Sequence, residues 1–128
     1  MLLKTYIVED SEIIRKRVMR LISGFDFVEI IGWSDDPDSA ISNIEMCLPD
    51  AVILDISIKD GNGIKMIGEI KKRVPHTIII MFTNFDIKNY REQAFRFGAD
   101  YYLDKSNDFT KLSGILECIK KSKLTKNH

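Results

Sequence analysis

The sequence has few of the residues that disulfide scaffolds and zinc sites require. Its two cysteines, Cys47 and Cys118, lie in separate stretches of helical patterning, and neither has a second ligand nearby at metal-binding spacing. We therefore expect two buried free thiols in a reducing cytosol rather than a disulfide or a metal site. The two histidines carry no further information, because His76 follows a proline in a turn and His128 is the last residue.

Neither an excess of one charge nor a long apolar run is present. Nineteen basic residues balance nineteen acidic residues, so the chain as a whole creates no field that would attract nucleic acid or an anionic membrane. No apolar run approaches the roughly 20 residues of a transmembrane helix, and the N-terminal residues lack the layout of a secretory signal. We expect a cytoplasmic protein with no membrane contact and no direct binding of nucleic acid.

What the sequence does contain is the composition of an ordinary globular protein, with 45% hydrophobic and 30% charged residues. A length of 128 residues predicts a single domain over residues 1–128 with a substantial core. No linker, internal repeat or low-complexity segment divides it, and the basic end of the chain from about residue 121 is expected to fray. The absence of a further domain suggests a protein that consists of this domain alone, with a piece of a longer protein as the alternative.

Short apolar runs alternate with stretches of helical periodicity along the chain. Strands are predicted at residues 3–8, 28–33, 51–54, 78–82 and 100–103. Helices are predicted from Ser11 to Gly24, from Asp35-Asp36-Pro37 to Pro49, from Ile64 to before Pro75, and at residues 86–97 and 108–121. This alternation is typical of an α/β, doubly wound, flavodoxin-like fold with helices on both faces of a five-stranded parallel sheet. We expect the strand order 2-1-3-4-5, with the less uniformly apolar second strand at an edge.

Polar residues that look out of place all follow the end of a predicted strand. Glu9 and Asp10 follow the first strand, Asp55 the third, Thr83 the fourth and Lys105 the fifth. Because the carboxyl ends of parallel strands lie on one edge of a sheet, we expect these side chains to meet in one pocket. Each residue alone is more often a helix cap, a solvated lysine or a strand-favouring threonine. Their joint placement carries the prediction.

Three carboxylates in one pocket repel one another unless a cation takes up their charge. Hard oxygen ligands in a half-open site suit Mg²⁺, so we predict magnesium at Glu9, Asp10 and Asp55. An ionised carboxylate is already a nucleophile, and Asp55 would attack a phosphoryl group to form an aspartyl phosphate. Lys105 would add a fixed positive charge, and Thr83 a hydroxyl donor.

These residues stand in motifs that resemble the receiver domain of two-component response regulators, over about residues 3 to 122. The motifs are Val8-Glu9-Asp10-Ser11, Leu54-Asp55-Ile56 with Asn62-Gly63, Phe82-Thr83, and Gly98-Ala99-Asp100-Tyr101-Tyr102-Leu103-Asp104-Lys105. The resemblance implies that Glu9 and Asp10 hold Mg²⁺ together with Asp55 and the backbone carbonyl of Ser57. It also implies that Asp55 accepts a phosphoryl group from a histidine kinase or a histidine phosphotransfer protein, as in a phosphorelay.

The resemblance further implies a signalling switch rather than an enzyme that converts a substrate. Thr83 and Lys105 would bind the phosphoryl oxygens, and Tyr102 would move inward when Thr83 moves. The surface that changes would be that of the fourth helix, fifth strand and fifth helix, where Phe95 is a candidate for partner contact and Phe97 is expected in the core. A downstream protein target is implied, and a homodimer through the same surface is a further option.

Two departures from the family pattern lead to predictions. Ser106 follows the lysine where many members have proline in a cis peptide, and a cis Lys105-Ser106 bond would cost about 2.5–4 kcal/mol, so we predict a trans bond. Asn84 follows the threonine where the family usually has a smaller residue, and Phe85 comes next. Bulk beside the pocket would slow access by water, so we expect a long-lived phosphoryl group.

Three other functions compete with this interpretation. A haloacid dehalogenase-like phosphatase needs a second aspartate two residues after the nucleophile, where this chain has Ser57. A flavodoxin-like cofactor binder needs a phosphate loop rich in serine, threonine and glycine after the first strand, which is missing. A receiver-like interaction module that works without phosphorylation remains the main alternative.

Overall fold

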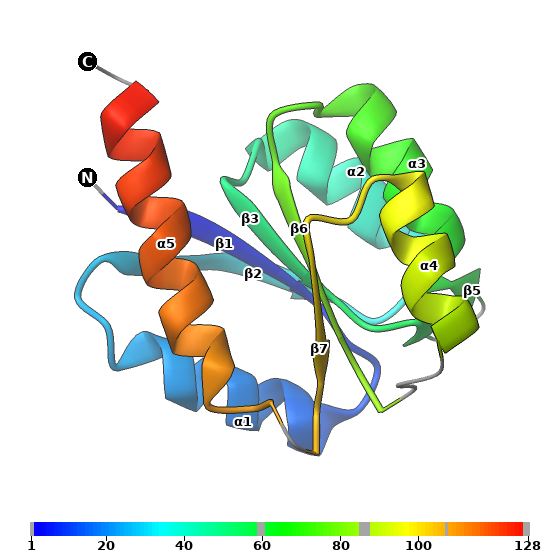
Figure 1. The fold of residues 1–128 in the computed structure, drawn as a ribbon, viewed down its shortest axis with the longest axis horizontal. Coiled ribbons are helices and arrows are strands. Elements are labelled where there is room, and N and C mark those ends of the chain that lie inside the picture. The colour runs from blue at the N-terminus through cyan, green and yellow to red at the C-terminus, as the bar shows by residue number, and fades with distance from the viewer. Residues whose placement is uncertain (1, 59–60, 85–87, 107, 127–128) are drawn as a thin grey trace.

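A parallel sheet of five strands forms the middle layer of the molecule, and helices cover both of its faces (Figure 1). This computed structural model describes residues 2–58, 61–84, 88–106 and 108–126. The sheet contains β1 (Leu3–Val8), β2 (Val28–Ser34), β3 (Ala51–Leu54), β6 (Ile78–Thr83) and β7 (Tyr101–Asp104). The helices are α1 (Glu12–Ser23), α2 (Pro37–Cys47), α3 (Gly63–Arg73), α4 (Lys88–Phe97) and α5 (Lys111–Lys126). Two short strands, β4 (Ser57–Ile58) and β5 (Gly61–Asn62), form an antiparallel pair outside the sheet, within a stretch predicted as a loop.

The strands of the sheet lie in the order β2-β1-β3-β6-β7. This is the predicted order, since β4 and β5 are not part of the sheet. Neighbouring strands all pair in parallel, β3 is buried along its whole length, and β2 lies at an edge. The predicted flavodoxin-like fold is therefore confirmed, and the carboxyl ends of the strands share one rim.

Two clusters of buried side chains fill the space between the sheet and the helices. α1 and α5 cover one face, where Ile22 and Leu116 are completely buried. α2, α3 and α4 cover the other face, with Ile44, Ile67 and Ala94 in the core (Figure 1). Because close packing on both faces leaves the strands little freedom, the side chains that follow the strand ends are held in fixed positions.

Polar side chains cap the first turns of three helices. The Ser11 hydroxyl accepts a hydrogen bond from the backbone N–H of Ile14 (3.3 Å), and the Asp36 carboxylate caps α2, with Pro37 as its first residue. The Asn62 side chain accepts from the first turn of α3. Such caps satisfy N–H groups that have no partner within the helix. The serine and aspartate caps confirm the predicted starts of α1 and α2.

The predicted burial of the two thiols is wrong. Cys47 and Cys118 are free, as predicted, but both are exposed. Cys47 ends α2 beyond its last buried residue, Ile44, and Cys118 lies off the stripe that Leu116 and Ile119 bury on α5. Whether each cysteine is buried thus depends more on its position along the helix than on its hydrophobic character.

Phe97 was expected in the core and is 47% exposed. It is the last residue of α4, and Gly98, with a φ of 116°, turns the chain at once toward β7. That backbone conformation favours glycine, and the sharp turn leaves the Phe97 ring at the surface. Phe95, expected outside the core, is 45% exposed.

The last helix is longer than predicted. α5 continues to Lys126, so residues 121–126 are helical where fraying was expected. Lysine and leucine are good helix formers, which accounts for the extension. Residues 86–87 of the predicted fourth helix, and Phe85, lie outside the described residues. Over the ranges that are described, no helix combines the length and the apolar character that crossing a membrane requires.

Candidate functional site

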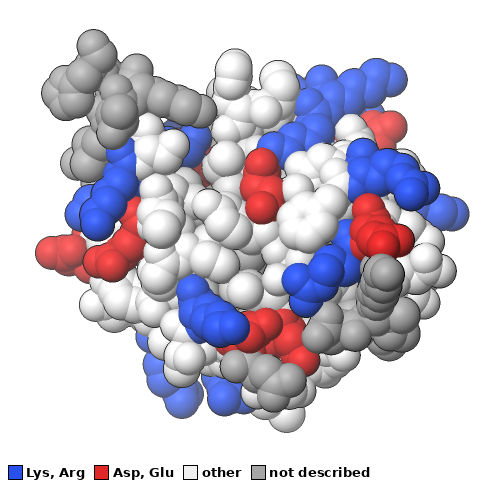
Figure 2. All heavy atoms as spheres, in the orientation of Figure 1, with Lys and Arg blue, Asp and Glu red and all other residues white. Residues whose placement is uncertain are grey.

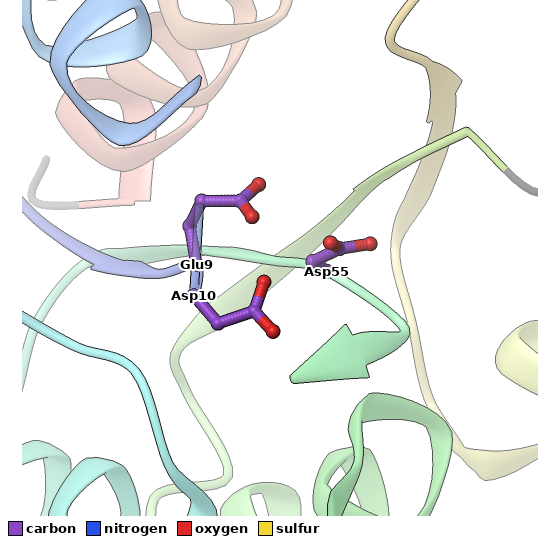
Figure 3. Close-up of side chains that lie close together, drawn as sticks. All are labelled: Glu9, Asp10 and Asp55. Carbon is purple, nitrogen blue, oxygen red and sulfur yellow. The ribbon is translucent and has the colours of Figure 1, made fainter. Parts of the chain in front are cut away.

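Three carboxylates meet at the rim formed by the strand ends. Glu9 and Asp10 follow β1, and Asp55 follows β3, whose last residue pairs with the last residue of β1. The backbone N–H of Asp55 donates to the carbonyl of Val8 (3.1 Å), which fixes the two segments side by side. One oxygen from each carboxylate lies within 4.8 Å of the others (Figure 3). Glu9 and Asp55 are buried, while Asp10 is exposed. The predicted cluster is therefore present.

Lys105 brings a positive charge to the same place from the end of β7. Its Nζ lies 2.6 Å from Oε1 of Glu9 and 2.9 Å from Oδ2 of Asp55. The lysine is only 8% exposed, and its backbone N–H donates to the carbonyl of Thr83 at the end of β6 (2.9 Å). Side chains that follow β1, β3 and β7 thus converge, as the sequence predicts, and the contact of Lys105 with the end of β6 is through the backbone of Thr83.

Burial and pairing act in opposite directions on the two charged groups. Burial raises the pKa of Glu9 above its usual value, against the opposing effect of the hydrogen bond from Lys105. Burial alone would lower the pKa of Lys105, but the hydrogen bond to Glu9 and the charge of Asp55 outweigh it, and the pKa is raised. The ammonium group therefore stays charged at neutral pH.

The site fits a bound divalent cation. Oδ1 of Asp55 is buried and has no hydrogen-bond partner among the described residues, which is costly for a carboxylate oxygen. A cation among the three carboxylates would remove that cost. They line a cavity of about 300 Å³ that Ser57 and Asn84 also line. Oxygen ligands beside an open cavity are the arrangement that Mg²⁺ prefers, because this ion keeps several of its waters.

A sequence model of the response regulator receiver domain matches residues 5–117. The chain belongs to this family. The match covers all four motifs on which the predicted resemblance rests, and that prediction is confirmed. The acidic cluster is also where receiver domains bind Mg²⁺.

Individual relatives of this receiver domain agree with the family match. This chain is 29% identical over 124 residues to the response regulator protein VraR of Staphylococcus epidermidis, and the match covers 95% of this chain and 57% of that protein. It is 32% identical over 122 residues to the sensory transduction protein LytT of Bacillus cereus, covering 95% of this chain and 49% of that protein. The chain therefore spans about half the length of these curated relatives.

A solved structure gives the same fold. The DNA-binding response regulator of the LuxR family from Staphylococcus aureus superposes with a TM-score of 0.85 at 28% identity, covering 92% of this chain and 98% of that chain. A LuxR-family two-component response regulator from Aurantimonas superposes with a TM-score of 0.87 at 25% identity, covering 93% and 85% of the two chains.

Of the other predicted site residues, Ser57 lines the cavity, whereas Thr83 and Tyr102 are buried. Thr83 is completely buried at the end of β6. Tyr102, in β7, is 5% exposed, and its ring lies 6.5 Å from the ring of Phe95. The guanidinium of Arg91 lies 4.9 Å from the Tyr102 ring centroid. The metal, phosphoryl-binding and switch roles of these residues stay predictions.

The loop that carries Lys105 is held without a proline. The described residues contain no cis peptide bond, so the prediction of a trans Lys105-Ser106 bond is confirmed. Oδ1 of Asp104 accepts from the backbone N–H of Ser106 (2.8 Å), and Oδ2 of Asp108 accepts from the backbone N–H of Asp104 (3.0 Å). Two short-range hydrogen bonds to aspartates thus fix this turn.

Sequence reasoning missed two residues that support the site. A Cβ on Gly63 would lie 1.9 Å from the backbone oxygen of Asp55, so only glycine fits between α3 and the loop after β3. Arg15 lies off the apolar stripe of α1 but is 9% exposed, and its Nη1 donates to the carbonyl of Glu9 (3.0 Å). The Asn62-Gly63 motif was a signal for the glycine. For Arg15 the sequence offered no comparable signal.

Proposed function

We propose that this receiver domain accepts a phosphoryl group on Asp55 in a reaction that depends on Mg²⁺, and that the acceptance switches a protein-binding surface. The donor would be a histidine kinase or a histidine phosphotransfer protein, in the cytoplasm. The observation that carries the proposal is the buried Oδ1 of Asp55, which has no hydrogen-bond partner among the described residues and lies beside two acids and a lysine. The protein would act as a phosphoacceptor and not as an enzyme with a substrate of its own.

The chemistry assigned to the chain's own residues is simple. An oxygen of Asp55 forms a bond to phosphorus while the bond from phosphorus to the donor's imidazole nitrogen breaks, and the electron pair stays on that nitrogen. No general base is needed, because the carboxylate is ionised when it attacks. Lys105 stabilises the phosphoryl oxygens electrostatically, and Thr83 donates a hydrogen bond. Bound at Glu9, Asp10, Asp55 and the Ser57 carbonyl, Mg²⁺ would neutralise charge on the phosphoryl group.

The proposed switch uses residues that lie between the site and the surface. Lys105 and Thr83 are joined through their backbones, and Tyr102 lies in β7 three residues before the lysine. The neighbouring Phe95 is 45% exposed on α4. We propose that a movement of Thr83 toward a phosphoryl group is passed through Tyr102 to Phe95. We propose the surface of α4, β7 and α5 as the partner-binding face, including a homodimer through it.

Charge on the proposed face is mixed. Figure 2 shows basic and acidic side chains interspersed around a largely uncharged centre over α4, β7 and α5. A mixed surface with an exposed aromatic favours a protein partner over nucleic acid. A relative in Mycobacterium tuberculosis is named a DNA-binding transcriptional activator, and this chain covers 48% of it. That the present chain does not bind nucleic acid directly stays part of the proposal.

Phosphorylation can be tested directly by intact mass. Incubation with acetyl phosphate and Mg²⁺ should add about 80 Da, the mass of one phosphoryl group. Asp55→Asn should gain nothing, while Asp26→Asn, which changes an exposed aspartate in the turn before β2, should gain the full mass. If the native protein gains no mass, the alternative of an interaction module without phosphorylation is favoured. Whether or not the native protein gains mass, a comparison of the partner proteins captured by the native chain and by Asp55→Asn would identify the target.

A further inference from the structure

The backbone of Glu9 is fixed from two sides. Its N–H donates to the carbonyl of Ser34, the last residue of β2 (3.0 Å), and its carbonyl accepts from Nη1 of Arg15 on α1 (3.0 Å). Its side chain is fixed as well, because Oε2 accepts from the backbone N–H of Ser11 (3.1 Å). Arg15 is thus one of the partners that hold Glu9 in place, and it is the one that contacts the Glu9 carbonyl.

Arg15 is in turn held by an aromatic ring. Its guanidinium carbon lies 3.6 Å from the centroid of the Trp33 ring, and its backbone N–H donates to the carbonyl of Ser11 (2.8 Å). Among the described residues, no carboxylate lies within ion-pair distance of this buried guanidinium. A buried cation without an ion pair is costly, and contact with an aromatic face offsets part of that cost. The arrangement is therefore one in which Trp33 keeps Arg15 at the Glu9 carbonyl.

A change of register in β2 places Trp33 on this face. Thr5 pairs with Ile30, but Tyr6 pairs with Gly32, so Ile31 is an extra residue in β2. An extra residue moves every later side chain of a strand to the opposite face, and Trp33 then points, like its partner Ile7, toward α1. Gly32 is needed at this point, because a Cβ there would lie 2.9 Å from the Tyr6 ring.

We propose that Arg15, held by Trp33, is a positioning residue that sets the Glu9-Asp10 backbone for metal binding. This inference rests on the function proposed above. Residues outside the ligand shell that orient metal ligands commonly matter tenfold to a hundredfold for metal affinity. Arg15 does so through a main-chain carbonyl, and it is not among the described residues that line the cavity.

A positioning role for Arg15 and a simple charge effect predict opposite changes in Mg²⁺ affinity when Arg15 is removed. Arg15 carries a positive charge next to a cation site, so its removal should by charge alone strengthen Mg²⁺ binding. If Arg15 instead positions the Glu9 backbone, its removal should weaken Mg²⁺ binding. Arg20 is the matched control, because it carries the same charge in the last turn of α1 and its side chain is exposed.

The test is Mg²⁺ titration of the whole chain by calorimetry. We expect Arg15→Met to weaken Mg²⁺ binding by about tenfold, and Arg20→Met to bind as the native protein does. At saturating Mg²⁺, the rate of phosphorylation of Arg15→Met by acetyl phosphate should return to within about twofold of the native rate, because only the metal step is impaired. If Arg15→Met binds Mg²⁺ as tightly as the native chain, or more tightly, the inference is overturned while the proposed function stands. If the native chain does not bind Mg²⁺, both are overturned.

Variants of Trp33 test the same positioning role without altering Arg15. They replace the first test if Arg15→Met does not fold. Trp33→Phe keeps an aromatic face and should bind Mg²⁺ nearly as the native protein does. Trp33→Leu removes that face and should weaken binding in the direction of Arg15→Met. Equal affinity of Trp33→Leu and Trp33→Phe would overturn the role of the ring.

Discussion

Lys105 Nζ lies 2.9 Å from Oδ2 of Asp55, and both side chains are 7% exposed. The pair joins residues 50 positions apart in the sequence, which meet because β3 and β7 end at the same rim. The ammonium group is shared between this carboxylate and that of Glu9 and offsets part of their charge. In the phosphorylation proposed above, the same ammonium group would stabilise the phosphoryl oxygens on Asp55, so one cation would serve both states of the proposed switch.

Lys105→Met should destabilise the protein by about 3–5 kcal/mol in the presence of a chelator, because it leaves two buried carboxylates without their cation. The loss should be smaller at saturating Mg²⁺, since a bound ion would replace the missing charge. Urea unfolding with and without Mg²⁺ measures both values. The control is Lys16→Met, whose ion pair with Glu12 is exposed, so its loss should leave the free energy of unfolding nearly unchanged in both buffers. An equal loss for Lys105→Met in both buffers would contradict the proposed metal site.

Gly63→Ala should lower the free energy of unfolding by about 1–3 kcal/mol and impair phosphorylation, because its Cβ collides with the backbone and not with a flexible side chain. The clash is with the carbonyl of Asp55, at 1.9 Å, so Asp55 itself has to shift. Gly114→Ala is the opposite case. Nothing lies within 4 Å of a Cβ at that exposed position on α5, and alanine should stabilise the helix by up to about 1 kcal/mol. Thermal unfolding of the two variants in parallel should show opposite signs, and a neutral Gly63→Ala would refute the packing argument.

Much of this arrangement could be predicted from the sequence because it depends on local patterns and one topological rule. The strands follow from apolar runs, the helices from their periodicity, and the rim from the fact that parallel strands end together. That rule is enough to bring Asp55 and Lys105 into one pocket. The family match then confirmed the resemblance, while the individual roles of Thr83, Ser57 and Tyr102 stay predictions.

What could not be predicted depends on contacts between distant elements. The burial of Arg15 requires an aromatic ring from β2, and that ring faces α1 only because of the extra residue at Ile31. No periodicity in α1 contains that information. Phe97 is the opposite case: its spacing predicts a buried residue, but α4 ends at Phe97 and the side chain is exposed. Side chains at helix ends and at strand irregularities follow the tertiary structure rather than the local pattern.

Asn84 should influence how long the phosphoryl group persists. It follows β6 and lines the same cavity as Asp55 and Lys105, where its side chain can obstruct an approaching water molecule. We expect a long-lived phosphoryl group in the native chain and faster loss in Asn84→Ala, since water would then approach more easily. Phosphate release after removal of acetyl phosphate measures both rates. A half-life of seconds for the native protein would count against this expectation.

Asp108→Ala should destabilise the loop that carries Lys105, in a way that depends on pH. The hydrogen bond from the backbone N–H of Asp104, and then that from Lys111, lower the pKa of Asp108 below its ordinary value of 3.8. A carboxyl group whose pKa is lower in the folded state contributes stability above the unfolded value, and that contribution is lost as pH falls through the folded value. Near neutral pH the variant should lose about 1 kcal/mol, and the difference from the native protein should shrink once pH drops below about 3.8. Asp108→Asn keeps an oxygen acceptor but no charge, so its smaller deficit should shrink over the same acidic range. Urea unfolding of all three proteins at a series of pH values measures these differences, and a deficit for Asp108→Ala that stays constant into the acidic range would show that the charge of Asp108 does not hold this loop.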